Sequence, residues 1–160
     1  MKGNPKVLEQ LHKLLRNELG ARDQYFTHSR MYQDWGLHKL YERIDHEMHD
    51  ETGHAAILIE RILFLEGTPD LSQQAGLNIG STVPEMLQSD LDYEYKVVAD
   101  LKEAIAVCEA ERDYETRKLL IPILDDTEVD HAHWLEQQLG LIKLMGLQNY
   151  LQSQMGSPES

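Results

Sequence analysis

Two Glu-x-x-His steps stand far apart in the sequence, Glu51 with His54 and Glu128 with His131. A carboxylate and an imidazole three residues apart lie on one face of a helix, where both can reach the same metal ion. An oxygen-rich set with one imidazole per step favours iron or manganese over structural zinc, which prefers tetrahedral cysteine and histidine sets. The spacing therefore indicates a centre for redox-active metal ions.

Two more glutamates occupy apolar helix faces. Glu18 continues a stripe of apolar residues at steps of three and four, and Glu94 interrupts another stripe between Leu91 and Val98. An ionised carboxylate inside an apolar core is strongly unfavourable unless a partner compensates its charge. Bundles that hold two iron ions use one glutamate from each of two helices and one Glu-x-x-His step from each of the other two. The predicted ligands are Glu18, Glu51, His54, Glu94, Glu128 and His131.

Helical periodicity and clear stop signals predict an all-α chain that forms a single domain over residues 1–160. The expected helices cover residues 5–34, 37–66, 83–112, 114–144 and 147–154, with a frayed tail at 156–160. Thr82 to Glu85 spells a capping box, and Pro122 predicts a kink. Residues 70–81 have no helical period and indicate a long crossover loop. Two hairpins joined by one long crossover give the connectivity of a ferritin-like four-helix bundle.

Composition excludes several classes of function. The 160 residues carry a net charge of −13 and no basic patch, which argues against binding to nucleic-acid phosphates. Cys108 is the only cysteine, so disulfides within the chain and cysteine-rich metal sites are excluded. The first residues, MKGNPKVLEQ, have no apolar signal core, and no apolar run approaches the length of a membrane span. We therefore expect a cytoplasmic protein without membrane contact.

The sequence resembles the bacterioferritins and the related haem-free bacterial ferritins. The similarity runs nearly end to end, from MKG at the start through NELGARDQYFTHSRMYQDWG, IERILFLEGTPDL and LNIG to WLEQQLGLIKLMGLQNYLQSQ. The resemblance implies a four-helix bundle with a short fifth helix, assembled from two-fold dimers into a hollow homo-oligomeric shell of 24 subunits. It also implies that Fe(II) is oxidised to Fe(III) by oxygen or peroxide and stored as mineral inside the shell.

The resemblance assigns the family's ferroxidase ligands to the six residues named above. It implies bridging carboxylates at Glu51 and Glu128, with the other four as terminal ligands. His46 and Asp50 fall where some bacterioferritins hold a further iron on the inner shell surface, and we include both as a secondary iron site. A small ferredoxin-type protein is the expected reductant for iron release.

One departure from the family concerns haem. Haem-binding members carry a methionine directly after the ligand that corresponds to Glu51, and this sequence has Thr52 there. Threonine is not a usual axial ligand of haem iron. We therefore expect no haem in a homo-oligomer, although the subunit could enter a mixed shell with a haem-binding partner.

Three alternatives remain open. The chain could be a structural shell subunit without catalysis, or another di-iron carboxylate enzyme such as a peroxidase. A rubrerythrin-type peroxidase normally adds a cysteine-rich iron site, which one cysteine cannot form. A DNA-protecting mini-ferritin typically has a basic tail and ligands shared between subunits, and this sequence shows neither. The presence of all six ligands argues against the purely structural alternative.

Overall fold

The computed structural model describes residues 1–156, and this part of the chain contains helices and no strand. The helices are α1 (Pro5–Asp34), α2 (His38–Phe64), α3 (Val83–Ala110), α4 (Tyr114–Asp125), the π-helix η1 (Asp126–Ala132), α5 (His133–Met145) and α6 (Leu147–Gln154). The predicted frayed tail lies, apart from residue 156, outside the described residues. Among the described helices, none is both long enough and apolar enough to cross a bilayer.

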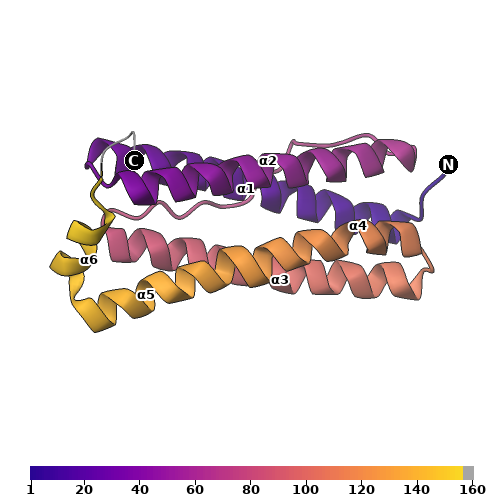
Figure 1. Cartoon of the computed structure of the whole chain (residues 1–160). Coiled ribbons are helices and arrows are strands. Elements are labelled where there is room, and N and C mark those ends of the chain that lie inside the picture. Colours follow the sequence, from indigo (N-terminus) through magenta and orange to yellow (C-terminus); the bar gives the residue numbers. More distant parts are fainter. Residues whose placement is uncertain (157–160) are drawn as a thin grey trace.

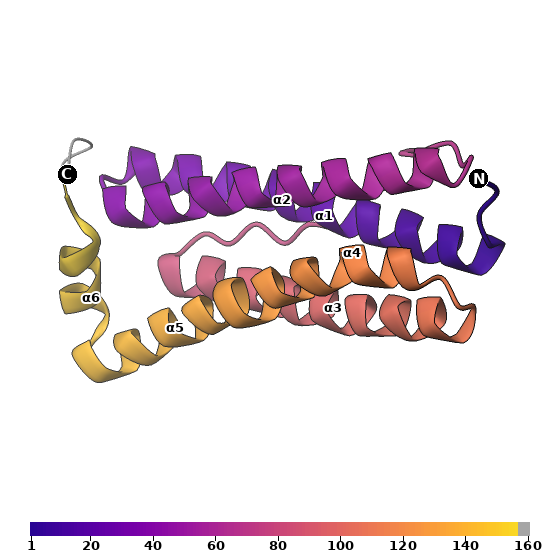
Figure 2. The ribbon, with the colours of Figure 1, turned by 45° about the vertical axis from the view of Figure 1, so that its right-hand side comes forward.

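Four long helical segments form the body of the molecule. Helices α1 and α2 make one antiparallel hairpin, and α3 pairs with the continuous run of α4, η1 and α5 to make the other (Figure 1). The crossover returns along the length of the bundle before α3 begins, and α6 lies across one end (Figure 2). This arrangement confirms the predicted all-α, ferritin-like bundle with a long crossover and a short fifth helix.

Local signals set the helix ends. The Asn4 side chain accepts a hydrogen bond from the Lys6 N–H at 2.8 Å, and Pro5 takes the first helical position of α1. The Thr82 hydroxyl accepts from the Glu85 N–H at 3.3 Å and caps α3. Between α5 and α6, Gly146 adopts a φ of 81°, a left-handed value that favours glycine and lets the chain turn.

A buried polar network fixes the crossover to the bundle. The Gly80 N–H donates to His28 Nε2 at 3.1 Å, so His28 Nδ1 carries the proton and donates to Asp90 Oδ1 at 2.9 Å. Gln24 Nε2 donates to the same oxygen at 2.8 Å, and Gln24 Oε1 accepts from the Asn78 N–H at 3.0 Å. Burial raises the pKa of Asp90, and the bonds from His28 and Gln24 offset part of that rise. Helices α1 and α3 are thereby tied to the loop that connects the hairpins.

The turn between α3 and α4 is held from α2. Asp113 caps α4 by accepting from the Thr116 N–H at 3.0 Å and from its hydroxyl at 2.7 Å. Arg61 donates to Asp113 at 3.2 Å and to the Thr116 hydroxyl at 2.8 Å. The Asp113 carboxylate therefore caps α4 and, through Arg61 of α2, also links the second hairpin to the first.

Replacing Asp113 with alanine should therefore destabilise the fold. Loss of the cap costs about 1–2 kcal/mol, which corresponds to a fall of roughly 2–8 °C in Tm for a chain of this size. Thermal unfolding followed by circular dichroism measures the change. Asp113→Asn is the matched control, because it keeps the cap acceptor and removes only the charge beside Arg61, so its fall should be smaller. Equal Tm values for Asp113→Ala and the wild type would contradict this account of the turn.

Candidate metal centre

Five of the six predicted ligands meet inside the bundle. They form two overlapping groups, and within each group one ligand atom per residue lies within 4.8 Å of the others. The first group is Glu18 from α1 with Glu51 and His54 from α2. The second is Glu51 with Glu94 from α3 and His131 from η1. All five side chains are buried, and Glu51 belongs to both groups.

Glu51 stands between two imidazoles. Its Oε2 lies 3.6 Å from His54 Nδ1, and its Oε1 lies 2.9 Å from His131 Nδ1. Glu18 Oε2 is 3.5 Å from His54 Nδ1, and Glu94 Oε1 is 3.8 Å from His131 Nδ1. The two rings have centroids 6.2 Å apart and planes inclined by 26°. Two groups of donor atoms therefore lie side by side and share one carboxylate.

The atoms that face the centre have no hydrogen-bond partners among the described residues. They are both carboxylate oxygens of Glu18, Oε1 of Glu51, Oε2 of Glu94, and Nδ1 of both His54 and His131. Buried polar atoms without partners are rare in folded proteins, because each one gives up its contacts with water. Carboxylate oxygens and imidazole nitrogens are also the donor atoms that iron accepts. The donor set therefore fits a pair of metal ions.

The charged groups of the cluster shift one another's pKa values. Burial and the charge of Glu51 raise the pKa of Glu94 to about 7, although His131 and Tyr25 offset part of the rise. Burial also acts to raise the pKa of Glu51, but the contacts from His131 and His54 outweigh it and lower that pKa. Burial lowers the pKa of His131, yet the surrounding carboxylates raise it well above its usual range. Tyr25 is fully buried and donates its hydroxyl to Glu94 Oε1.

The structure places Glu128 elsewhere, so its predicted position on the inward face is wrong. Its side chain is 50% exposed and pairs with Lys102 at 3.2 Å. The cause is the π-helical winding of residues 126–132, in which each backbone bond spans five residues instead of four. One face of such a turn repeats at a longer interval, so Thr127 takes the buried position and Glu128 turns outward. Helix α4 continues through Pro122, and the winding changes only at Asp126.

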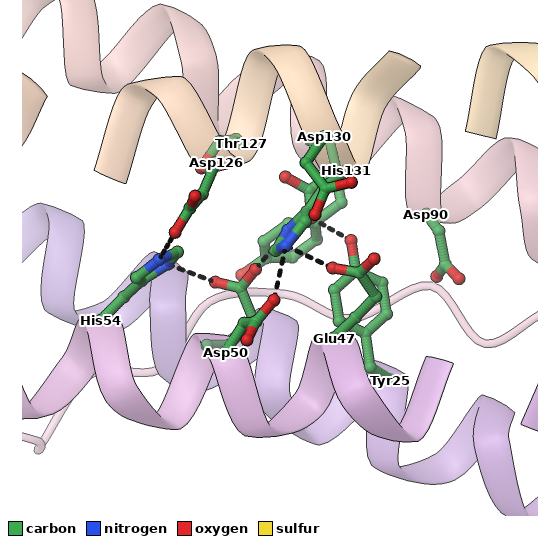
Figure 3. A network of polar contacts seen from close by, with 12 residues as sticks. Tyr25, Glu47, Asp50, His54, Asp90, Asp126, Thr127, Asp130 and His131 are labelled. Carbon is green, nitrogen blue, oxygen red and sulfur yellow. Dashed lines mark hydrogen bonds and ion pairs between the residues drawn. The ribbon is translucent and has the colours of Figure 1, made fainter. Parts of the chain in front are cut away.

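A second ring of carboxylates surrounds the centre, and Figure 3 shows these side chains pointing at the outer edges of the imidazoles. Asp126 Oδ2 lies 2.9 Å from His54 Nε2. Asp50 Oδ2 lies 3.2 Å from His131 Nε2, which Glu47 also contacts. Glu47 is buried on the inward face of α2, one turn before Glu51, as the helical spacing of the two residues indicates. The helical spacing of the sequence does not mark Asp126 as part of the site, because a regular α-helix would not bring it to this face.

His46 and Asp50 also lie together, with His46 Nε2 3.5 Å from Asp50 Oδ2. The His46 side chain is exposed, whereas Asp50 is partly buried and reaches inward to His131. The hydrogen bond from His131 is the main cause that lowers the pKa of Asp50. Asp50 therefore connects the surface histidine with the buried centre.

Comparisons with known proteins agree with this arrangement. A family model described as a ferritin-like domain matches residues 8–145. A bacterial ferritin from Synechocystis is 76% identical over 155 residues, which cover 97% of this chain and 99% of the relative. The chain belongs to the bacterial ferritin family. A bacterial ferritin from Paramagnetospirillum magnetotacticum is 62% identical over 157 residues, covering 98% of this chain and 96% of the relative.

The similarity extends to proteins named bacterioferritin. One from Brucella melitensis is 41% identical over 150 residues, which cover 94% of this chain and 92% of the relative. The predicted membership of the bacterial ferritin and bacterioferritin family is thereby confirmed. Thr52 is exposed and donates its hydroxyl to the Met48 carbonyl at 3.0 Å. Its correspondence to the haem-ligating methionine stays a prediction. Exclusion of haem from a homo-oligomer stays a prediction.

Proton release on metal binding should depend on pH through Glu94. Because its pKa is about 7, Glu94 is mostly protonated at about pH 6 and mostly ionised at about pH 8, and a bound cation needs the ionised form. Binding of Zn²⁺ should therefore release fewer protons, and be tighter, at the higher pH. Calorimetry in buffers of different ionisation enthalpy counts the protons. Glu94→Gln should lose this part of the pH dependence, and equal release by the wild type at both pH values would contradict the assignment.

Proposed function

We propose that this chain is a ferroxidase subunit of an iron-storage shell. Membership of the bacterial ferritin family supports iron storage, and the donor set of the centre supports iron as the substrate. The observation that carries the proposal is the placement of Glu51, with one carboxylate oxygen toward each imidazole. Two ions held on either side of Glu51 are close enough to share one oxidant.

In the proposed reaction, two Fe(II) ions bind beside His54 and His131. The carboxylates of Glu18, Glu51 and Glu94 offset the positive charge, and Glu94 gives up its proton as the cation arrives. Each iron then loses one electron, and the pair of electrons reduces oxygen to peroxide, or peroxide to water, with protons taken from solvent. Hard oxygen donors favour the ferric state, which draws the reaction forward. Ferric ions then enter the mineral store.

We further propose that Glu128 joins the centre when iron binds, as the family resemblance implies. In the structure Glu128 pairs with Lys102 in water, where both side chains are at least half exposed. Exposed ion pairs contribute about 0–1 kcal/mol, so the contact with Lys102 by itself does little to hold Glu128 outside the centre. Lys102→Ala should then leave metal binding unchanged or slightly tighter. A clear loss of binding in Lys102→Ala would count against the movement.

His46 and Asp50 are proposed as the secondary iron position. Their 3.5 Å contact brings one imidazole nitrogen and one carboxylate oxygen together at the surface. Asp50 also approaches His131 at 3.2 Å, so an ion held there would lie beside the buried centre. Such a site suits transfer of iron between the centre and the store.

The assembly proposed is a homo-oligomeric shell of 24 subunits built from two-fold dimers. Large apolar side chains that one subunit leaves exposed, such as Phe26, Trp35 and Leu144, supply surface for these contacts. Because the family resemblance puts Thr52 where haem-binding members carry the axial methionine, we propose that a haem-binding subunit can share a mixed shell. A small ferredoxin-type protein is the proposed reductant.

The assembly has a simple test. A shell of 24 chains of 18.5 kDa has a mass of about 440 kDa. Size-exclusion chromatography with light scattering measures the mass of the purified protein. Only monomers or dimers at every concentration would contradict the shell.

Iron oxidation should fail when the shared carboxylate is removed. Adding Fe(II) in air to Glu51→Ala should give an initial rate at least about tenfold below that of the wild type, because changes even around metal ligands cost 10–100-fold. The rate is followed by the near-ultraviolet absorbance of Fe(III). Glu60→Ala is the matched control, since Glu60 is an exposed glutamate of the same helix and should keep the wild-type rate.

The same assay separates the alternatives. Equal rates for the wild type and Glu51→Ala would favour the structural shell subunit over the ferroxidase. Peroxide consumption without retention of Fe(III) in the particle would favour a peroxidase.

A further inference from the structure

Both imidazoles of the centre are turned in the same sense. Nδ1 of His54 and of His131 faces the centre and has no hydrogen-bond partner among residues 1–156. Nε2 of each ring reaches a carboxylate outside the centre, Asp126 for His54 and Asp50 with Glu47 for His131 (Figure 3). These outer contacts come from different helices, so one local turn does not explain the shared orientation.

We propose that Asp126, behind His54, and Asp50 together with Glu47, behind His131, are positioning residues that fix the tautomer of the two metal-binding histidines. This inference rests on the proposed function. A neutral imidazole has one N–H and one free lone pair, and the hydrogen bond made by one nitrogen decides which nitrogen can bind a metal. A carboxylate at Nε2 holds the proton there, so that the lone pair of Nδ1 points at the cation. The same carboxylate makes the imidazole a stronger donor.

The π-helix η1 places Asp126 beside His54. Asp126 is the first residue of η1, and it crosses from the second hairpin to His54 on the first, with its Oδ2 2.9 Å from Nε2. The groups at Nδ1 are Glu18 and Glu51, so the ring separates Asp126 from the ligands. Asp126 therefore acts through His54 rather than on the ion. The winding that turns Glu128 outward is the same winding that brings Asp126 to this contact.

Glu47 is held differently. It is buried, and Arg43 Nε donates to its Oε1 at 2.6 Å, which leaves Oε2 toward His131. Arg43 also donates to Asp130 at 2.8 Å, and its guanidinium lies 4.8 Å from the centre of the Trp134 ring. The charge of Glu47 is thus compensated inside the protein. Asp126 is 51% exposed, and within residues 1–156 no arginine contacts it, so the two metal positions are inequivalent.

This difference makes a selective effect measurable. Asp126→Ala should weaken metal binding at the His54 position by about 10–100-fold, the usual cost of losing a carboxylate behind a metal-bound histidine, and leave the His131 position unchanged. The readout is an anaerobic titration of the metal-free shell with Co²⁺, whose visible absorption reports both occupancy and coordination. The wild type should bind two ions per subunit at the centre, apart from any ion held at His46 and Asp50.

Two variants separate positioning from charge and from folding. Asp126→Asn keeps an acceptor for the Nε2 proton and should restore most of the affinity that Asp126→Ala loses. Asp125→Ala removes a neighbouring exposed carboxylate and should titrate like the wild type. Because Asp126 lies at the surface, all three variants should unfold at temperatures close to that of the wild type. Glu47→Gln, which keeps the side-chain shape, should change the Co²⁺ spectrum of the His131 position only.

The outcomes distinguish this inference from the function on which it rests. If the wild type binds two Co²⁺ ions and Asp126→Ala binds them with the same affinities and spectrum, the positioning role is overturned and the ferroxidase proposal stands. If the wild type itself binds no Co²⁺ at the centre, the result contradicts the proposed ferroxidase function. If Asp125→Ala instead loses as much affinity for Co²⁺ as Asp126→Ala, the loss is an effect of surface charge, and the positioning role is overturned.

Discussion

Three carboxylates that face one another inside an apolar bundle are the constraint on which the structure depends. Glu18, Glu51 and Glu94 are each almost fully removed from water, and their mutual repulsion grows as the surrounding dielectric falls. Protons on the histidines and on Glu94 reduce the charge, and the raised pKa values of His131 and Glu94 show this response. Such compensation leaves several inward oxygens without hydrogen bonds. Two bound cations would satisfy them more completely than protons do.

The bundle builds the two candidate cation positions in different ways. Glu18, Glu51 and His54 all come from α1 and α2, so one position belongs to the first hairpin. The other joins Glu51 to Glu94 and His131, and an ion there would link the two hairpins. The polar network of the crossover lies one turn before Glu94, where Asp90 ties α3 to α1. The loop that connects the hairpins therefore also helps to fix the spacing of the metal ligands.

The sequence predicts most of this site because α1, α2 and α3 are regular. Over regular α-helix, steps of three and four residues identify the inward face, and Glu18, Glu51, His54 and Glu94 follow that rule. Glu128 does not, because its helix widens into a π turn, and the spacing of apolar residues does not mark that change. The structural role of His28 is not predictable from the sequence for another reason. Its partner Asp90 is 62 residues away, and only the fold brings the two side chains together. A long helical period can be recognised in the sequence, whereas a change of helical winding or a distant polar partner cannot.

The most direct test is anomalous diffraction from a crystal of the protein loaded with iron, measured on both sides of the iron absorption edge. We expect two anomalous peaks per subunit that flank Glu51, one beside His54 Nδ1 and one beside His131 Nδ1. A well-loaded crystal with no peak inside the bundle, or with these imidazoles turned so that Nε2 faces the centre, would contradict the account.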